Sequence, residues 1–419
     1  MKNRYKKYLS IFALALSGGS IYLIPFIKYV FYDQLMGAMN ISNTQMGFTL
    51  TMYSIGCTLL YIPGGILADR FSAKKSMIAS LLGTSALTIL FGITLNYALS
   101  NVIWLLLAVS TGFVFWSSLM KAIGLIGDDD EKGRMYGIYY AGNGIVGAVV
   151  NSLALWTFAR FSDPVTGMRM AIFVMAGATI VSAIMVGIFF DEKKKQNTSE
   201  NKVENTEKFD LSQVKEVIKN PLVWMVSISI LCAYTLFTVN SYFTPYLTDV
   251  VGISENASST IAIIRTNLFL VFCAPLGGYI VDKIKSTSKW CIIGNILVAV
   301  FFLLLLIIPS NVNSTLLIVL TLIPSAISLM VYGVMFSMVS ECKFPSYVTG
   351  TVIGIASIIG YLPDFYAHNI CGRFLDKFGN GGYTYIFGYL FANCILGTIL
   401  GVLIRKKLKS QNKEISINK

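Results

Sequence analysis

Long apolar segments alternate with short polar ones along almost the whole chain. Crossing the hydrocarbon core of a bilayer, about 30 Å thick, takes about 20 residues of helix, and most of the apolar segments have this length. The pattern therefore predicts twelve membrane-spanning helices, near residues 8–32, 46–69, 76–97, 102–124, 135–158, 169–190, 221–248, 257–281, 290–308, 315–340, 348–370 and 383–404.

One polar segment, residues 191–220, is far longer than the others and contains almost no large apolar residue. It separates six predicted spans from six more. Its second part, 209–218, has apolar residues at spacings of two to four and predicts an amphipathic helix on the membrane surface. The predicted domains are an N-terminal six-helix bundle (1–190), a cytoplasmic linker (191–220), a C-terminal six-helix bundle (221–404) and a cytoplasmic tail (405–419).

Two short segments repeat each other: 63–70 reads PGGILADR, and 275–283 reads PLGGYIVDK. Each lies at the end of a predicted span, with glycines that would let two helices approach closely. In each, an acid and then a base follow the last glycine. This internal duplication predicts two equivalent halves of one membrane protein.

The first copy and its continuation, GILADRFSAKK at 65–75, resemble the loop between helices 2 and 3 of the major facilitator superfamily, G-x-L-x-D-R-x-G-R-K. Ser72 and Ala73 depart from that pattern. The resemblance covers nearly the whole chain and implies an all-α fold of twelve transmembrane helices in two pseudo-symmetric six-helix bundles, with a substrate site between them. It also implies that a set of charged residues gates the cytoplasmic side: Asp69, Arg70, Arg134, Asp282 and Lys283.

Composition supports the membrane assignment, because 55% of residues are hydrophobic and only 13% are charged, about half the usual share for a soluble protein. The basic residues collect near the N-terminus, in loop 70–75, in the linker and in the tail. By the positive-inside rule, both termini are cytoplasmic and the protein lies in the cytoplasmic (inner) membrane. This asymmetry, with attraction to anionic lipid, accounts for the net charge of +12 without nucleic acid. The first span contains Pro25 and Lys28 and lacks a cleavage site, so it is expected to stay in the protein.

No motif of an enzyme is present. The chain has no G-x-x-x-x-G-K-[ST] phosphate loop, no G-x-S-x-G and no H-E-x-x-H. Its seven cysteines are scattered without C-x-x-C spacing, which predicts small buried side chains rather than disulfides or metal ligands. We therefore expect no cofactor and no metal, and transport driven by a gradient of protons or of a counter-substrate.

Charged residues inside predicted spans are the strongest functional signal, because each costs about 2.5–3.5 kcal/mol at the centre of a membrane helix. Arg265 lies about 14 Å into its span, as estimated from the rise per residue. It either binds an anionic group of the substrate or holds two helices together. Lys28 lies among tyrosines, where it binds substrate or extends to the interface. Lys121 is expected to be an interfacial anchor, and the alternative is that it faces the cavity.

In the span 348–370, polar and small residues recur at steps of three and four, which predicts one stripe along one helix face. The only histidine of the chain lies four residues after an acid, so Asp364 and His368 are candidate proton carriers, or else a hydrogen-bonded pair near the outer mouth. The stripe consists of Gly350, Gly354, Ser357, Tyr361, Asp364 and His368.

The span 135–158 shows a weaker stripe of Tyr136, Tyr140, Asn143, Gly147 and Asn151. The asparagines are candidates for binding substrate, whereas the alternative interpretation of the glycines is helix contact alone. Trp116 could stack on a sugar or aromatic ring. The predicted substrate-binding residues are Lys28, Arg265, Asn143, Tyr140, Tyr361 and Trp116.

Residues 121–147, 264–266 and 350–364 resemble a group of bacterial permeases related to the organophosphate antiporters and to permeases for sugars and sulfosugars. Such relatives often have arginine in place of Asn143. Two basic residues and only one acidic residue are predicted to lie deep enough in the membrane to contact a substrate. This excess of positive charge favours an anionic solute, moved by symport or antiport. The alternatives are drug or lipid efflux by the same fold, and a transporter-like nutrient sensor, against which the short linker argues.

Overall fold

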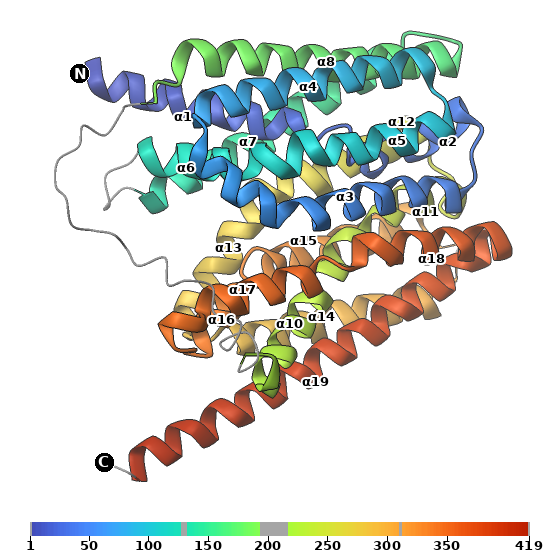
Figure 1. Cartoon of the computed structure of the whole chain (residues 1–419). Coiled ribbons are helices and arrows are strands. Elements are labelled where there is room, and N and C mark those ends of the chain that lie inside the picture. The colour runs from blue at the N-terminus through green and yellow to red at the C-terminus, as the bar shows by residue number, and fades with distance from the viewer. Residues whose placement is uncertain (1, 127–131, 193–216, 310–311, 418–419) are drawn as a thin grey trace. The chain divides into compact units, whose positions relative to one another are not determined.

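A computed structural model describes residues 2–126, 132–192, 217–309 and 312–417 (Figure 1). This described part is helical throughout, with short turns between the helices. Eight of its helices are long and apolar enough to cross a membrane, and the last of them, Val348–Gln411, contains two of the predicted spans. The linker helix expected at 209–218 lies almost wholly outside the described residues.

The chain divides by its internal contacts into two compact units. The first consists of Met1–Lys193, Ser241–Phe272 and Asp364–Tyr383, and the second of Lys194–Asn240, Cys273–Pro363 and Thr384–Lys419. The first unit therefore combines the N-terminal helices with two segments from later in the sequence. Because this division rests on contacts alone, the two six-helix halves and their boundaries stay a prediction.

The first unit is built on long helices that pack in pairs. α1 lies against α7 and α8, α4 lies against α8, and α3 lies against α5. Its elements are α1 (Lys2–Ile21), η1 (Ile27–Tyr29), α2 (Tyr32–Met39), α3 (Asn43–Arg70), α4 (Ala73–Thr94), α5 (Tyr97–Ala108), η2 (Val109–Phe115), α6 (Trp116–Ile126), α7 (Lys132–Phe158), α8 (Pro164–Phe189), α11 (Phe243–Asp249), α12 (Glu255–Ile263), η5 (Ile264–Leu268), most of α18 (Pro363–Phe378) and η6 (Gly379–Gly381).

In the second unit, α10 packs against α15 and α17, and α14 packs against α15. An alanine Cβ at Gly277 would lie 2.1 Å from the carbonyl oxygen of Met330, so the repeated segment at 275–283 does use a glycine for close helix contact. The elements of this unit are α10 (Pro221–Val239), most of α13 (Phe269–Ile284), α14 (Thr287–Ile307), α15 (Ser314–Tyr332), α16 (Ser337–Glu341), α17 (Ser346–Gly360) and most of α19 (Gly382–Ile417), while η4 (Asn240–Tyr242) begins at its boundary.

Each helix that follows a repeated segment begins at a serine and receives a carboxylate from elsewhere in its own unit. Ser72 Oγ donates to Glu192, whose Oε1 also accepts from the backbone N–H of Ala73 at 3.1 Å. In the second unit, Glu341 accepts from Ser286 Oγ at 2.7 Å and from the N–H of Ser288 at 2.6 Å. A negative charge is favourable at a helix N-terminus, so these contacts fix the starts of α4 and α14.

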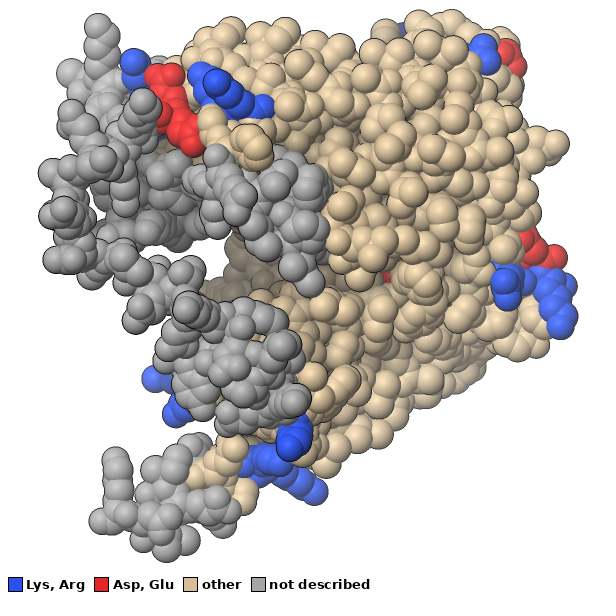
Figure 2. All heavy atoms as spheres, in the orientation of Figure 1, with Lys and Arg blue, Asp and Glu red and all other residues tan. Residues whose placement is uncertain are grey.

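Many large apolar side chains lie on the surface of the described residues. On the face shown in Figure 2, Lys and Arg gather at the margins, and the broad area between them is uncharged. Large apolar side chains such as Ile188, Phe272 and Leu59 are more than 60% exposed, as expected for helices that contact lipid. All seven cysteines are buried, as predicted.

Candidate functional site

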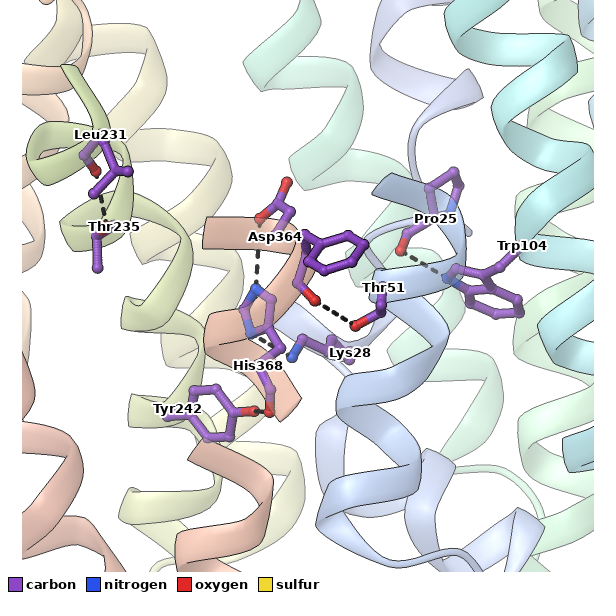
Figure 3. A network of polar contacts seen from close by, with 10 residues as sticks. Pro25, Lys28, Thr51, Trp104, Leu231, Thr235, Tyr242, Asp364 and His368 are labelled. Atoms are coloured by element: carbon purple, nitrogen blue, oxygen red, sulfur yellow. Dashed lines mark hydrogen bonds and ion pairs between the residues drawn. The ribbon is translucent and has the colours of Figure 1, made fainter. Parts of the chain in front are cut away.

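The first predicted span does not continue as a single helix. α1 ends at Ile21, and turns together with η1 occupy the chain up to the start of α2 at Tyr32. Pro25 lies in this break, and its carbonyl oxygen accepts a hydrogen bond from Trp104 Nε1 at 3.1 Å (Figure 3). The break places Lys28 on η1, where the residue is only 2% exposed and does not reach an interface.

Lys28, His368 and Asp364 form a row of polar contacts in the first unit (Figure 3). Lys28 Nζ lies 2.7 Å from His368 Nδ1, and His368 Nε2 lies 3.6 Å from Asp364 Oδ1. When Lys28 is an ammonium it only donates hydrogen bonds, so Nδ1 is then the acceptor and the hydrogen of a neutral imidazole lies on Nε2, facing the carboxylate. In that state, the row runs from a cation through a neutral imidazole to the Asp364 carboxylate.

Two tyrosines surround this row. The Tyr242 ring stacks on His368 with centroids 5.7 Å apart, and its centroid lies 4.8 Å from Lys28 Nζ. The Tyr242 hydroxyl donates to the backbone carbonyl of His368 at 2.6 Å. The Tyr29 ring is tilted against His368 at 6.3 Å. The aromatic faces shield the histidine and offer the ammonium a cation–π contact.

Close packing between α3 and α18 holds His368 in place. An alanine Cβ at Gly47 would lie 2.4 Å from the backbone carbonyl oxygen of His368, so only glycine lets the two helices approach this closely. Thr51 Oγ1 donates to the carbonyl of Phe365 at 2.9 Å. At the start of α3, the Asp376 carboxylate accepts from the backbone N–H groups of Asn43 and Thr44, at 2.9 and 2.8 Å.

The second buried cation, Arg265, lies in the π-helical turn η5, a kind of turn that often occurs at functional sites. It is 2% exposed. Its Nη2 donates to Thr244 Oγ1 at 2.7 Å, and its Cζ lies 5.7 Å from the centroid of the Phe243 ring. Within the described part of the chain, Arg265 Nε and Nη1 have no hydrogen-bond partner. Buried donors without acceptors are costly, and an anion would satisfy them.

Thr244 links the surroundings of the two cations. While its Oγ1 accepts from Arg265, the same hydroxyl donates to the backbone carbonyl of Tyr29 at 2.9 Å, the residue after Lys28. Ser259 Oγ donates to the carbonyl of Val30 at 2.7 Å. Side chains of α11 and α12 therefore hold the broken segment that carries Lys28.

Comparison with known proteins places this chain in a family. The family model described as Major Facilitator Superfamily matches residues 8–368. The chain belongs to this superfamily. The major facilitator fold is also evident from solved structures: a bacterial homologue of the human lysosomal transporter Spinster, inward-facing and unoccupied, gives a TM-score of 0.72 at 14% identity over 98% of both chains. A mutant of the nucleoside transporter NupG gives a TM-score of 0.71 at 12% identity, covering 96% of this chain and 99% of that one.

Among curated relatives, the inner membrane protein YqcE of Escherichia coli is 29% identical over 381 residues, 89% of this chain and 88% of that protein. The inner membrane protein YihN of the same organism is 26% identical over 413 residues, 98% of each. A hexuronate transporter of Bacillus subtilis is 22% identical over 258 residues, 60% of this chain and 59% of that one. This chain is therefore a multi-pass inner membrane protein, like YqcE and YihN, and as a member of the major facilitator superfamily it is a transporter and not an enzyme.

The prediction that the stripe of span 348–370 lies on one face of a single helix is wrong. α17 ends at Gly360, and α18 begins at Pro363 after a turn at residues 361–362. Pro363 has no N–H to continue the helix and disfavours helical backbone in the residue before it. Asp364 and His368 nevertheless share one turn of α18 and lie together, as their spacing predicted.

The stripe of span 135–158 serves helix packing in part. Asn151 Nδ2 donates to Asn267 Oδ1 at 3.1 Å, and a Cβ at Gly147 would lie 2.3 Å from Asn267 Nδ2. Asn143 is half-buried and donates to the Tyr139 hydroxyl at 3.2 Å, while Tyr140 is exposed. Gly147 and Asn151 of α7 therefore form the contact between α7 and η5. Substrate binding by Asn143 and Tyr140 stays a prediction.

The other predicted residues have surroundings of their own. Trp116 packs against the apolar core of α1, α4, α6 and α8. Tyr361 belongs to the second unit, with its ring edge-on to Tyr234 at 4.7 Å. Of the predicted gating residues, Asp282 and Lys283 are exposed on α13. The side chains of Asp69, Arg70 and Arg134, and that of Lys121, lie outside what the structure describes.

Sequence reasoning missed three residues of this site or gave them too little weight. Tyr242 is only one of several polar residues in its span, and Thr244 gives no signal in the sequence. An acid just beyond the predicted end of span 348–370, as Asp376 is, was a signal that could have been used. The partner of Thr244 lies 215 positions away, which no local pattern indicates.

Proposed function

We propose that this secondary transporter moves a small organic anion that carries hydroxyl groups, such as a sugar acid, across the inner membrane by alternating access. The observation that carries the proposal is Arg265. Its guanidinium is buried, two of its nitrogens have no acceptor among the described residues, and its one hydrogen bond goes to a neutral hydroxyl. A carboxylate accepts two parallel hydrogen bonds from such a fork.

The balance of buried charge also favours a negatively charged substrate. Among the described residues that are buried, the charged groups are Lys28, Arg265 and Asp364, with His368 as the one group that could add a further positive charge. Asp364 faces the histidine, so it does not compensate Arg265. A site with one positive charge in excess favours an anion over a neutral or cationic solute.

A hydroxylated anion fits the neighbouring polar groups. Gln34 Nε2 donates to Ser259 Oγ at 2.9 Å, while Gln34 Oε1 is buried without a hydrogen-bond partner in the described part of the chain. A substrate hydroxyl would donate to such an oxygen. The similarity to a hexuronate transporter and the resemblance to permeases of the organophosphate and sugar group support an acidic sugar derivative.

The test is thermal unfolding of the purified protein with a panel of sugar acids, sugar phosphates, sulfonates, neutral sugars and cationic drugs. A ligand that binds only the folded state raises the apparent melting temperature. We expect one class of anion to stabilise the wild type. Arg265→Ala should remove the effect, Arg265→Lys should keep only part of it, and Arg373→Ala, which removes an exposed arginine, should leave it unchanged.

Two results would contradict the proposal. One is stabilisation by neutral sugars or cationic compounds that persists in Arg265→Ala, which would favour sugar uptake or drug efflux. The other is stabilisation by an anion to the same extent in Arg265→Ala and in the wild type. Uptake of the labelled ligand into proteoliposomes then distinguishes a transporter from a sensor, because a sensor binds without accumulating its ligand.

A further inference from the structure

The contact between Lys28 and His368 makes two protonation states exclude each other. At 2.7 Å there is room for a single hydrogen between Nζ and Nδ1. The ammonium occupies that position with its own proton, since it has no lone pair to accept another. His368 therefore cannot carry a proton on Nδ1 while the Lys28 ammonium is bound to it. A doubly protonated imidazole and a bound ammonium do not coexist in this arrangement.

We propose that His368 and the transported anion compete for Lys28, so that a proton taken up on His368 Nδ1 releases the ammonium to the anion. This inference rests on the proposed function and adds to it the coupling ion and the residue that couples. One proton and one anion then bind together, which is symport. The proton comes from the side on which the anion enters and leaves with it on the other side.

The structure gives each partner an alternative contact after this exchange. The protonated imidazole retains Asp364, whose Oδ1 already lies 3.6 Å from Nε2, so the new positive charge has a carboxylate beside it. Lys28 is on the short turn η1 and has a long flexible side chain. The Tyr242 ring, 4.8 Å from Nζ, keeps a cation–π contact available while the ammonium changes partner.

The charge balance explains why the anion must follow the proton. With Lys28, Arg265 and protonated His368 against Asp364, the site would hold two positive charges in excess, which is costly inside a membrane protein. An anion between the cations removes most of that cost. Protonation and anion binding therefore stabilise each other, and by linkage each strengthens the other by the same factor.

Other titratable groups near His368 are few in the described structure. η1 contributes Lys28 and Tyr29, η4 contributes Tyr242, and α18 itself contributes Asp364 and the buried Cys371. α2 contributes Tyr32, whose ring lies 5.8 Å from that of Tyr242. From α3, the contacts are made by Gly47 and Thr51, which do not titrate.

The only histidine of the chain allows a direct test. With 15N-labelled histidine in the purified full-length protein, NMR reports the protonation of His368 alone. Without ligand, we expect a neutral ring with its hydrogen on Nε2 and a hydrogen-bonded Nδ1, whose signal changes in Lys28→Met. At fixed pH, saturating D-glucuronate as a probe, or an anion that stabilises the protein in the panel above, should increase the protonated fraction.

Binding measurements complete the test. The affinity of the anion should strengthen by about tenfold for each unit by which the pH falls, until His368 is protonated in the free protein. His368→Gln should still bind but lose this pH dependence. Cys371→Ala, which removes a buried thiol on the same helix, should keep it. Arg265→Ala should abolish binding and leave the neutral form of His368 as in the wild type.

Each failure has a distinct signature. Hydrogen on Nδ1 in the neutral ring overturns the competition, and this result needs no variant and no ligand. An anion that binds through Arg265 but leaves the protonation of His368 unchanged overturns the coupling while the proposed function stands. Failure of every anion to bind, with the Nδ1 signal still dependent on Lys28, overturns the proposed function and the coupling with it.

Discussion

Gly47 is the residue on which the position of His368 depends most directly. A methyl group there would meet the carbonyl oxygen of His368 at 2.4 Å, and backbone atoms cannot rotate away as a side chain can. We expect Gly47→Ala to lower the free energy of unfolding by about 1–3 kcal/mol, measured by thermal unfolding. Gly37→Ala is the matched control, since nothing lies within 4 Å of its added Cβ. Equal stability of the two variants would contradict the close contact.

Tyr242 contributes both a hydroxyl and an aromatic ring, and a substitution by phenylalanine tests the hydroxyl alone. Tyr242→Phe removes the hydrogen bond to the His368 carbonyl and keeps the aromatic face next to Lys28. We expect a loss of about 1 kcal/mol in stability, because a buried carbonyl loses its side-chain donor. Thermal unfolding would show it, with Tyr279→Phe, an exposed tyrosine, as control. An unchanged melting temperature in Tyr242→Phe would mean that the hydroxyl is dispensable.

Among helices, the start of α3 depends on a carboxylate from α18. Asp376 accepts from the first N–H groups of α3, so Asp376→Ala leaves those donors unsatisfied and removes a favourable charge from the helix N-terminus. We expect a loss of about 1 kcal/mol and faster hydrogen exchange in a peptide that covers residues 40–50. Lys377→Ala, the next residue on α18, is the control. Exchange that does not differ between the two variants would argue against this cap.

The start of α8, between two predicted spans, provides a pH dependence. Asp163 accepts from Thr166, and these hydrogen bonds hold the pKa of its carboxyl below the usual value. Since the pKa is lower in the folded state, the cap stabilises the protein above the unfolded pKa of about 3.9. The contribution is lost as the pH falls through the folded pKa. We expect the difference in melting temperature between wild type and Asp163→Ala to be constant from about pH 7 to 5 and to shrink below about pH 4. Asp282→Ala, which removes a carboxylate that caps no helix start, should show no such change.

The sequence predicted the helices well and their interruptions poorly. Span length follows from the apolar segments alone, because lipid requires about 20 apolar residues wherever a helix crosses. The breaks before Lys28 and Asp364 depend on Pro25 and Pro363, which were visible, yet proline is tolerated inside membrane helices such as α13 and α15. Whether a proline ends a helix depends on the neighbouring helices, which single-sequence patterns do not specify.

The sequence predicted residues of the candidate site, but it did not predict that Lys28 contacts His368. Lys28 and Arg265 were predicted because they are basic residues inside predicted spans. Asp364 and His368 were predicted to interact because they lie four residues apart. The contact between Lys28 and His368 joins residues 340 positions apart, and nothing in the local pattern of either one indicates the other. Two residues assigned to different tasks, substrate binding and proton transfer, are in contact in the structure.

For the whole molecule, the distribution of basic residues predicts an orientation. From the charge asymmetry we expect both termini in the cytoplasm and the loop that contains Arg160 outside. A fluorescent protein fused after residue 419 should fluoresce, whereas alkaline phosphatase at the same position should be inactive. Alkaline phosphatase fused after Phe161 should be active. The opposite activities would reverse the orientation, and both fusions inactive in otherwise stable chains would contradict the number of spans.

The starts of α4 and α14 also bear on the history of the chain. Both follow copies of one duplicated segment, and both begin at a serine that bonds a glutamate. The glutamates do not correspond, because Glu192 follows the last helix of the N-terminal half whereas Glu341 ends α16, in the middle of the other half. If the two predicted halves arose from one duplicated segment, each half acquired its acid separately, because neither glutamate has a counterpart at the same place in the other half.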